Sequence, residues 1–307
     1  MRAMENKRED ITPALLLNYF KIGLRKVKYQ KGYTLINISG LAVGLACCAI
    51  MMLWVRNEKS FDRFHTHRDS IYRLIKETST NGKKTLDARI TYPLVETIHG
   101  KIPEVKNYTR YQGVEGWKIS YGDKFFYNDF LSTADSTFFE IFTFPFVKGD
   151  PKTALKNRNS IVLTESMARK YFGTEEPIGK VLTIIQSSYT FTVTGVMKDV
   201  PKNSHLHFDC IVPILNFWEW WDGRQDGWGM IMFYTYLQLH PNSSPASVGP
   251  KIAAVLNENV PQQKAGIIMQ PLKDVHLRRT EPGSSHEDTR CSSICTHSFP
   301  YYGIGHR

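Results

Sequence analysis

The sequence YTLINISGLAVGLACCAIMMLWV, residues 33–55, is a run of 23 residues without a charged side chain. As an α-helix, at about 1.5 Å per residue, it would be about 34 Å long and could cross a hydrocarbon core of about 30 Å. A lone span must satisfy its own backbone hydrogen bonds, so it has to be helical. The sequence therefore predicts a transmembrane helix over residues 33–55.

The charge next to this stretch predicts its orientation. Residues 1–32 contain eight Lys or Arg and three Asp or Glu, a net charge of +5 out of +10 for the whole chain. Basic residues near a span are retained on the cytoplasmic side. We therefore expect a protein of the inner (plasma) membrane, with residues 1–32 cytoplasmic and the main domain periplasmic. Because topology explains the basic charge, we expect no nucleic-acid partner.

A cleaved leader is the alternative to a retained anchor. Secretory apolar regions are about 7–15 residues long, shorter than this run. A lipoprotein-type cleavage before Cys47 or Cys48 fits poorly, because Gly44 precedes Cys47 by three residues and apolar sequence continues beyond both cysteines. A retained transmembrane helix is the favoured interpretation.

Small residues predict a partner for this helix. Gly40 and Gly44 form a G-x-x-x-G pair, a spacing that lets another membrane helix approach closely. Asn37 adds a lone amide that could bond across a helix pair. The alternative is that glycine is simply frequent in membrane spans.

Residues 16–28 form a basic amphipathic pattern just before the span. Leu16, Phe20 and Leu24 fall on one helical face, whereas Lys21 and Arg25 fall on the other. Such a helix suits the inner headgroup layer, with membrane lipid as its partner. An ordinary soluble helix is the alternative interpretation.

The region after the span, residues 56–277, is long enough for a substantial core and two subdomains. Strands are predicted over residues 71–78, 106–111, 117–121, 125–133, 160–163, 180–185, 189–196, 208–215, 232–239 and 267–272. Helices are predicted over residues 91–99, 135–142, 164–172 and 244–257. Asp135 and Thr164 are the expected N-caps, and Gly173 is the expected end of the third helix. The predicted fold class is α+β.

Motifs that would carry catalysis, a cofactor or a metal ion are weak or absent from the sequence. The loop GTEEPIGKV, residues 173–181, resembles a phosphate loop but has five residues between its glycines and Val181 in place of Ser or Thr. His205, His207 and Asp209 alternate, so a strand would place them on one face as metal ligands. A polar strand edge is the favoured explanation. We therefore expect no catalytic, cofactor-binding or metal-binding residues.

Two further segments leave alternatives open. Four tryptophans cluster in NFWEWWDGRQDGWG, residues 216–229, as either an exposed contact loop or part of the core. Residues 278–307 contain no Leu, Val, Ala, Met or Lys, which predicts a disordered tail or a frameshift. Within it, Cys291, Cys295 and His297 match none of the usual zinc spacings.

Several motifs in fixed order resemble one family. INISGLAVGLACC in the span is followed by SFDRFHTHRDSIYRL, residues 60–74, then by DSTFFEIFTFPFVKGDPKTAL, IVLTESMARKYFG, EEPIGK, FTVTGVMKDVPKNSHLHFD and YTYLQL. Together they look like a MacB/FtsX-type ABC transporter permease, with a MacB-like periplasmic core domain over residues 56–277. The resemblance implies a porter-like part near the membrane and an inserted second lobe.

The resemblance also implies a mode of action. Such a permease is not an enzyme; it pairs with a separate ABC ATPase subunit that binds ATP, and it forms a homodimer or a heterodimer with another permease. ATP hydrolysis is then coupled to movement of the periplasmic domain for export or signalling. The family has further spans after this domain, and none follows here, so we expect a permease subunit or a truncated fragment. The alternative is a single-span, membrane-anchored periplasmic protein that binds a partner without transport.

Overall fold

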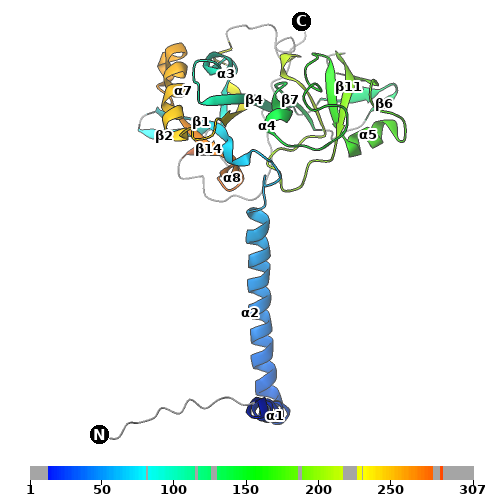
Figure 1. Ribbon diagram of the computed structural model, residues 1–307, viewed down its shortest axis with the longest axis vertical. Coiled ribbons are helices and arrows are strands. Elements are labelled where there is room, and N and C mark those ends of the chain that lie inside the picture. The colour runs from blue at the N-terminus through cyan, green and yellow to red at the C-terminus, as the bar shows by residue number, and fades with distance from the viewer. Residues whose placement is uncertain are drawn as a thin grey trace. The chain divides into compact units, whose positions relative to one another are not determined.

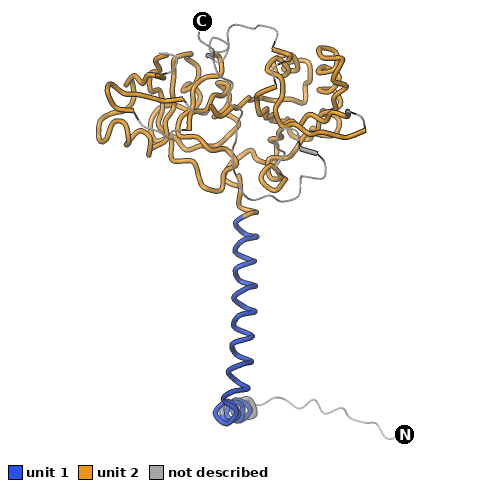
Figure 2. Tube along the Cα trace, turned by 180° about the vertical axis from the view of Figure 1, so that it is seen from behind, with its two compact units in different colours: residues 1–57 blue, residues 58–307 orange. Residues whose placement is uncertain are grey.

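The chain folds into two units in the computed structural model (Figure 2). Unit 1 comprises residues 1–57 and unit 2 comprises residues 58–307. The structure describes residues 13–80, 82–114, 117–125, 130–185, 189–216, 227–229, 231–278 and 284–285. The tail beyond residue 285, and most of the tryptophan-rich loop, lie outside these residues.

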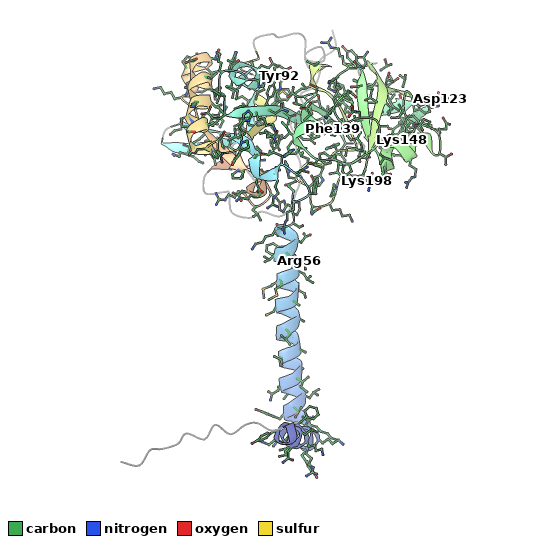
Figure 3. The ribbon with its side chains drawn as sticks, in the orientation of Figure 1. Arg56, Tyr92, Asp123, Phe139, Lys148 and Lys198 are labelled. Atoms are coloured by element: carbon green, nitrogen blue, oxygen red, sulfur yellow. The ribbon has the colours of Figure 1, made fainter. Side chains whose placement is uncertain are left out.

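Unit 1 is built from two helices, α1 (Pro13–Tyr29) and α2 (Lys31–Glu58), whose last residue belongs to unit 2. The predicted span lies within α2, which is long and apolar enough to cross a membrane. No side chain of α2 is buried, and Figure 3 shows its side chains pointing away from the helix axis all round. A helix that is apolar on every side suits lipid or other membrane helices as its surroundings.

Unit 2 mixes short helices with strands, so the predicted α+β class is confirmed. Its helices are α3 (Leu94–Ile98), α4 (Phe138–Ile141), α5 (Glu165–Phe172), α7 (Pro245–Asn259) and α8 (Leu272–Val275). Its strands are β1 (Ile71–Thr80), β2 (Lys83–Asp87), β3 (Arg89–Thr91), β4 (Val105–Val114), β5 (Ile119–Tyr121), β6 (Lys124–Phe125), β7 (Leu131–Ala134), β8 (Phe146–Lys148), β9 (Ser160–Thr164), β10 (Val181–Ile184), β11 (Tyr189–Met197), β12 (Cys210–Pro213), β13 (Ile231–Leu239), β14 (Gly266–Pro271) and β15 (Ser284–Ser285).

One hydrogen-bonded sheet runs through unit 2. Its strand order is β15-β2-β1-β13-β4-β7-β12-β9-β11-β10-β5-β6, with β14 on β1, β3 on β13 and β8 on β11. Neighbours β4 and β13 are antiparallel, although the strands β5 to β12 lie between them in the sequence. We call the part that contains β1–β4, β13 and β14 the first lobe, and the part that contains β5–β12 the second lobe. The chain leaves the first lobe after β4 and returns to it at β13.

The first lobe contains the predicted strand–helix–strand unit at the end of the domain. Strands β13 and β14 both run antiparallel to β1, so they are parallel to each other and are joined by α7. Helix α7 lies against β14, and Figure 1 shows α7 and α3 in the same part of unit 2. This split β-α-β arrangement holds β1 between two strands that come 160 or more residues later.

Three large clusters and two small ones contain the buried hydrophobic side chains in the described part of unit 2. The first-lobe cluster includes Leu74, Ile98 and Ile252, and the second-lobe cluster includes Tyr171 and Phe191. A middle cluster joins them and is aromatic-rich; its rings are Tyr111, Phe138, Phe139, Phe142, Phe144, Phe208 and Tyr236. Phe139 is labelled in Figure 3. Burying large rings at this point ties the two lobes together.

Two of the three residues predicted to begin or end a helix do so in the structure. Thr164 caps α5 as predicted, since its Oγ1 accepts a hydrogen bond from the Met167 amide at 3.3 Å. Gly173 ends that helix with φ of 65°, a conformation that favours glycine. The predicted Asp135 cap is wrong: α4 follows Thr137, and the Asp135 carboxylate is bound to Arg110 instead.

Some strand boundaries also differ from prediction. The single strand expected over residues 125–133 is two strands, because β6 ends at Phe125 and β7 begins at Leu131. Strands β2, β3 and β8 and helix α8 were not predicted. Each is at most five residues long, too short for a periodic pattern to stand out.

Candidate functional site

The segment directly after α2 is held by several distant parts of unit 2. We call residues 58–67, which are the last residue of α2 and the nine residues after it, the exit segment. It consists mainly of turns, yet Asp62 and His65 are only 1% and 2% exposed. Buried polar groups in an irregular segment need specific partners, so this is where we place the candidate functional site.

The first tie is to the loop between β11 and β12. The Asp62 amide donates to the Asn203 carbonyl at 2.9 Å, and the Asn203 side-chain amide donates to the Ser60 carbonyl at 3.0 Å and to its Oγ at 3.1 Å. The His205 amide donates to Asp62 Oδ1 at 3.1 Å. Backbone and side chains on both segments thus hold them in register, 143 residues apart in the sequence.

His205 extends this tie into the sheet. Its Nδ1 lies 2.8 Å from Asp62 Oδ1, and its Nε2 lies 2.9 Å from the Tyr236 hydroxyl on β13. Tyr236 is 1% exposed and belongs to the middle cluster. The row Asp62–His205–Tyr236 therefore connects the exit segment to the strand where the chain returns from the second lobe.

The second tie is to the connection between α4 and β8. The Thr143 amide donates to His65 Nδ1 at 3.0 Å, and the Thr66 amide donates to Thr143 Oγ1 at 3.0 Å. Around the His65 ring lie Phe64, Phe142 and Phe144, with centroids 4.1, 5.0 and 5.3 Å away. The imidazole is thus held in an aromatic cage with one hydrogen bond to fix its direction.

The third tie involves the residue after α8. His276 Nε2 lies 2.8 Å from Glu58 Oε2, and the His276 ring stacks on Phe61 at 3.3 Å with a 4° interplanar angle. The Glu58 and His276 side chains are 24% and 30% exposed. Such a pair contributes less than a buried one, because water screens it.

Backbone conformation shows how firmly the exit segment is held. Asp62 has φ of 57°, in the left-handed region that non-glycine residues rarely adopt. Asp tolerates this region better than most residues, but its presence in a buried turn indicates that the surrounding bonds fix the conformation. Strained backbone that is held by several surrounding contacts is common at functional sites and in segments that switch conformation.

Electrostatics in this cluster favour a neutral His65 and an ionised Asp62. Burial lowers the pKa of His65 from 6.5 to about 4, against the opposing attraction of Asp62. Burial raises the pKa of Asp62, but the hydrogen bond and charge of His205 outweigh it and hold the pKa below its ordinary value of 3.8. Asp62 Oδ2, His65 Nε2 and His205 Nδ1 have no partner of hydrogen-bond geometry among the described residues, although His205 Nδ1 lies 2.8 Å from Asp62 Oδ1.

The site is built from hydrogen bonds and ring contacts. Among the described residues no group of three or more His, Cys, Asp or Glu side chains could hold a metal ion. Its contacts join residues 58–66 to three separate parts of unit 2. We call these ties, made by residues 143, 203, 205 and 276, the clamp.

The residues predicted to act in the membrane all lie on the two helices of unit 1. Asn37, Gly40 and Gly44 are exposed on α2, and a Cβ added at either glycine would meet nothing within 4 Å. On α1, Phe20 is 68% exposed, and Lys21 and Arg25 are exposed as well. The side chains of Leu16 and Leu24 lie outside the described residues. The structure leaves their membrane roles as predictions.

The predicted metal candidates are used in other ways. Residues 205–209 are not a strand, so the expected shared face does not form. The His207 carbonyl accepts from the Tyr111 hydroxyl at 3.0 Å, and Asp209 Oδ2 accepts from the Phe130 amide at 2.9 Å. His205 alone of the three enters the candidate site.

The other sequence motifs have structural roles where they are described. In the phosphate-loop-like segment, Lys180 Nζ lies 2.8 Å from Glu175 Oε2, and Glu176 pairs with Lys148. Of the tryptophan-rich loop, Trp228 is half-buried against the first-lobe cluster. Trp218, Trp220 and Trp221 lie outside the described residues.

Most residues of the clamp were not singled out from the sequence. Asp62, His65, Thr143 and Asn203 were quoted only within family motifs, and His276 not at all. One local signal was available: a carboxylate and an imidazole three residues apart, in a turn directly after a span. Their distant partners leave no pattern in the sequence, because the pairings depend on the fold.

Solved structures that match this chain include three domains whose descriptions name a permease, MacB and an ABC-type transporter. A domain of a protein described as a permease, from Porphyromonas gingivalis, is 22% identical with a TM-score of 0.57, over 68% of this chain and 92% of that one. The periplasmic region of MacB from Actinobacillus actinomycetemcomitans is 14% identical with a TM-score of 0.47, over 66% and 89%. The extracellular domain of the ABC-type transporter YknZ from Gram-positive bacteria is 16% identical with a TM-score of 0.48, over 64% and 99%. The first of these shows that unit 2 shares its fold with that domain.

The family of the chain is shown by a match between its sequence and a family model. A family model described as the MacB-like periplasmic core domain matches residues 34–255. The chain belongs to this family and carries a MacB-like periplasmic domain of the ABC transporter permease type, which confirms the resemblance drawn from its motifs. No curated protein matches the chain.

Proposed function

We propose that the chain acts as a permease subunit of a MacB/FtsX-type ABC transporter. A separate ABC ATPase subunit binds and hydrolyses ATP, and this chain converts the resulting movement of its membrane helix into movement of its periplasmic domain. The output is export of a substrate or signalling to a periplasmic target. This chain itself holds no cofactor and catalyses no reaction.

The clamp is the observation that carries this proposal. A flexible linker between a membrane helix and an outer domain would absorb any displacement of the helix. Here the residues directly after α2 are bound to the β11–β12 loop, the α4–β8 connection and the end of α8. Displacing the end of α2 therefore acts on both lobes of unit 2 through short, partly buried contacts.

The proposed topology and partners follow from unit 1. The basic residues before α2 support a cytoplasmic N-terminus in the inner membrane. The exposed basic face of α1 suits the lipid headgroup layer, and the Gly40–Gly44 face suits a second permease helix, in a homodimer or a heterodimer. An ATPase on the cytoplasmic side then has a membrane helix on which to act.

Purification with associated subunits tests the proposal. The tagged full chain is extracted from its native membrane in mild detergent, and co-purified proteins are identified by mass spectrometry and assayed for vanadate-sensitive ATP hydrolysis. We expect a stoichiometric ABC ATPase whose hydrolysis changes when Asp62 and Asn203 are both replaced by Ala. The matched control is Lys198→Ala, an exposed change in the same β11–β12 loop.

Two outcomes would contradict the proposal. If no ATPase with ABC motifs accompanies the chain, the alternative of a single-span anchored binding protein takes its place. If an ATPase is present but its activity is identical in the wild type and the clamp variant, the clamp does not couple the two.

A further inference from the structure

His65 and His205 occupy the same buried cluster but respond differently to a proton. Neutral imidazole has one N–H donor and one acceptor nitrogen, whereas imidazolium has two donors and no acceptor. Protonation therefore breaks a hydrogen bond when a histidine nitrogen accepts from a group that can only donate. It need not break the bond when the partner can both donate and accept.

His65 is an example of the first case. Its Nδ1 accepts the Thr143 backbone N–H at 3.0 Å, and a backbone amide can only donate. The neutral ring must carry its proton on Nε2, which lies 3.9 Å from Asp62 Oδ1. A second proton on Nδ1 would face the Thr143 amide hydrogen, so charging His65 breaks this hydrogen bond, while the bond from the Thr66 amide to Thr143 Oγ1 does not involve the imidazole.

His205 is built to tolerate a proton. Its Nδ1 faces the Asp62 carboxylate at 2.8 Å, and its Nε2 faces the Tyr236 hydroxyl at 2.9 Å. A hydroxyl can donate to a neutral nitrogen or accept from a protonated one. Both contacts therefore persist in either charge state, and the Asp62–His205–Tyr236 row stays intact while the His65–Thr143 tie does not.

The charged and titratable groups around His65 set the direction of the response. Asp62 comes from the exit segment itself, His205 from the β11–β12 loop, and Tyr236 from β13; Arg73 on β1 faces Tyr236. Among the described residues, the α4–β8 connection contributes aromatic rings and the amide and hydroxyl of Thr143. Burial and the nearby His205 lower the pKa of His65, whereas Asp62 opposes them.

We propose that the His65–Thr143 hydrogen bond is a proton-operated latch: acidification outside the membrane charges His65 and releases its ring from the α4–β8 connection, while Asp62 still holds the β11–β12 loop and Thr66 still bonds Thr143. The clamp thus has a fixed part and a releasable part. The inference adds a regulatory input to the proposed function, but its test needs only the folded chain, so the two can fail separately.

The direction and size of the effect follow from linkage. In the latched state the pKa of His65 is about 4, against an ordinary value of 6.5 that applies once the ring reaches water. The released state binds the proton more tightly, so its share grows as the pH falls from 6.5 towards 4. With these two values, the released fraction rises about 20-fold between pH 7 and pH 5.

Amide hydrogen exchange on the full chain in lipid nanodiscs tests this directly. The exchange rate of the Thr143 amide, corrected for its intrinsic pH dependence, should rise about 20-fold from pH 7 to pH 5. His65→Gln, which cannot take a proton, should remove this rise. His67→Gln is the matched control: His67 is exposed two residues away in the same segment, so the rise should remain.

A second measurement uses only the wild type, so it tests the latch even if the His65→Gln variant does not fold. In the wild type labelled with ¹⁵N-histidine, His65 should show an unprotonated Nδ1 at pH 7 and titrate well below 6.5. The latch is overturned if His65 titrates near 6.5 in the folded chain, if Thr143 exchange is independent of pH, or if folded His65→Gln keeps the rise.

Discussion

Two buried polar networks in unit 2 differ in how completely their atoms are paired. At the junction of the lobes, Arg110 is 1% exposed and each of its guanidinium nitrogens is bonded: Nε and Nη2 to Asp135 at 2.9 and 2.6 Å, and Nη1 to the Tyr92 carbonyl at 2.9 Å. The Tyr92 ring, labelled in Figure 3, lies 3.6 Å from the guanidinium carbon. In the clamp, by contrast, Asp62 Oδ2 and His65 Nε2 have no partner among the described residues.

This difference indicates that the Arg110–Asp135 network has a fixed geometry, whereas the geometry of the clamp can change. A fully paired buried network has one low-energy arrangement and specifies the fold. A partly paired network holds its shape by a smaller margin, so a proton or a mechanical load can change it. We therefore expect the Arg110 network to determine stability and the clamp to determine response.

The largest expected loss of stability comes from breaking the Arg110–Asp135 network. Asp135→Ala leaves the buried Arg110 charge with only Glu96, whose side chain is 51% exposed, as an acidic partner. Removing one member of a buried ion pair costs about 3–5 kcal/mol. Urea unfolding of the full chain in detergent measures this loss. Glu96→Ala is the control, and its loss should stay below about 1 kcal/mol; equal losses would remove the distinction between the partners.

Asp62→Asn should cost less, with a characteristic pH dependence. The amide can keep the bond from the His205 amide but loses the charge that faces the His205 ring, a change worth about 1.5–3 kcal/mol. The folded-state pKa of Asp62 is below 3.8, so its stabilising contribution is full above pH 3.8 and is lost as the pH falls further. The difference between variant and wild type, from unfolding at several pH values, should be constant from pH 5 to 7 and shrink in stronger acid. A difference that grows in acid would contradict this assignment.

His276→Ala should have a smaller effect. It removes the Glu58 ion pair and the stack on Phe61, but these groups are partly exposed. The expected loss is about 1 kcal/mol, measured by the same unfolding assay. A loss as large as that of Asp135→Ala would show that the α8 end of the clamp, rather than the buried histidines, carries its strength.

Replacing Gly40 and Gly44 by Leu should leave the unfolding of unit 2 unchanged. A Cβ at either position meets nothing within 4 Å, so the single chain accommodates the change. Association of the helix in a membrane dimerisation assay should nevertheless fall, because a close helix–helix approach needs small residues. Unchanged association would remove the predicted packing face.

Much of the fold could be read from local sequence signals, whereas most of the clamp could not. The 23-residue apolar run, the Thr164 cap and the Gly173 stop are properties of short segments, and the structure contains all three elements. Asp135 shows the limit of such signals. Its position suited a helix cap, but a buried arginine 25 residues earlier in the chain binds its carboxylate instead.

The clamp depends on contacts across still longer separations. Ser60 meets Asn203 across 143 residues, and Glu58 meets His276 across 218. The sequence drew attention to His205 for the wrong reason, since alternation with His207 and Asp209 suggested a metal face on a strand that does not form. Irregular loops such as residues 198–209 have no periodicity, so the direction of their side chains is set by the fold around them.

The most direct test of coupling through the clamp is a distance measurement between the lobes. Spin labels at exposed positions Lys101 in the first lobe and Asp123 in the second lobe, in the chain reconstituted with the proposed ABC ATPase, report their separation by pulsed electron paramagnetic resonance. We predict that ATP with vanadate shifts the distance distribution in the wild type, and that Asp62→Ala with Asn203→Ala abolishes the shift while ATP hydrolysis continues. An equal shift in the clamp variant, or no shift in the wild type, would contradict the account.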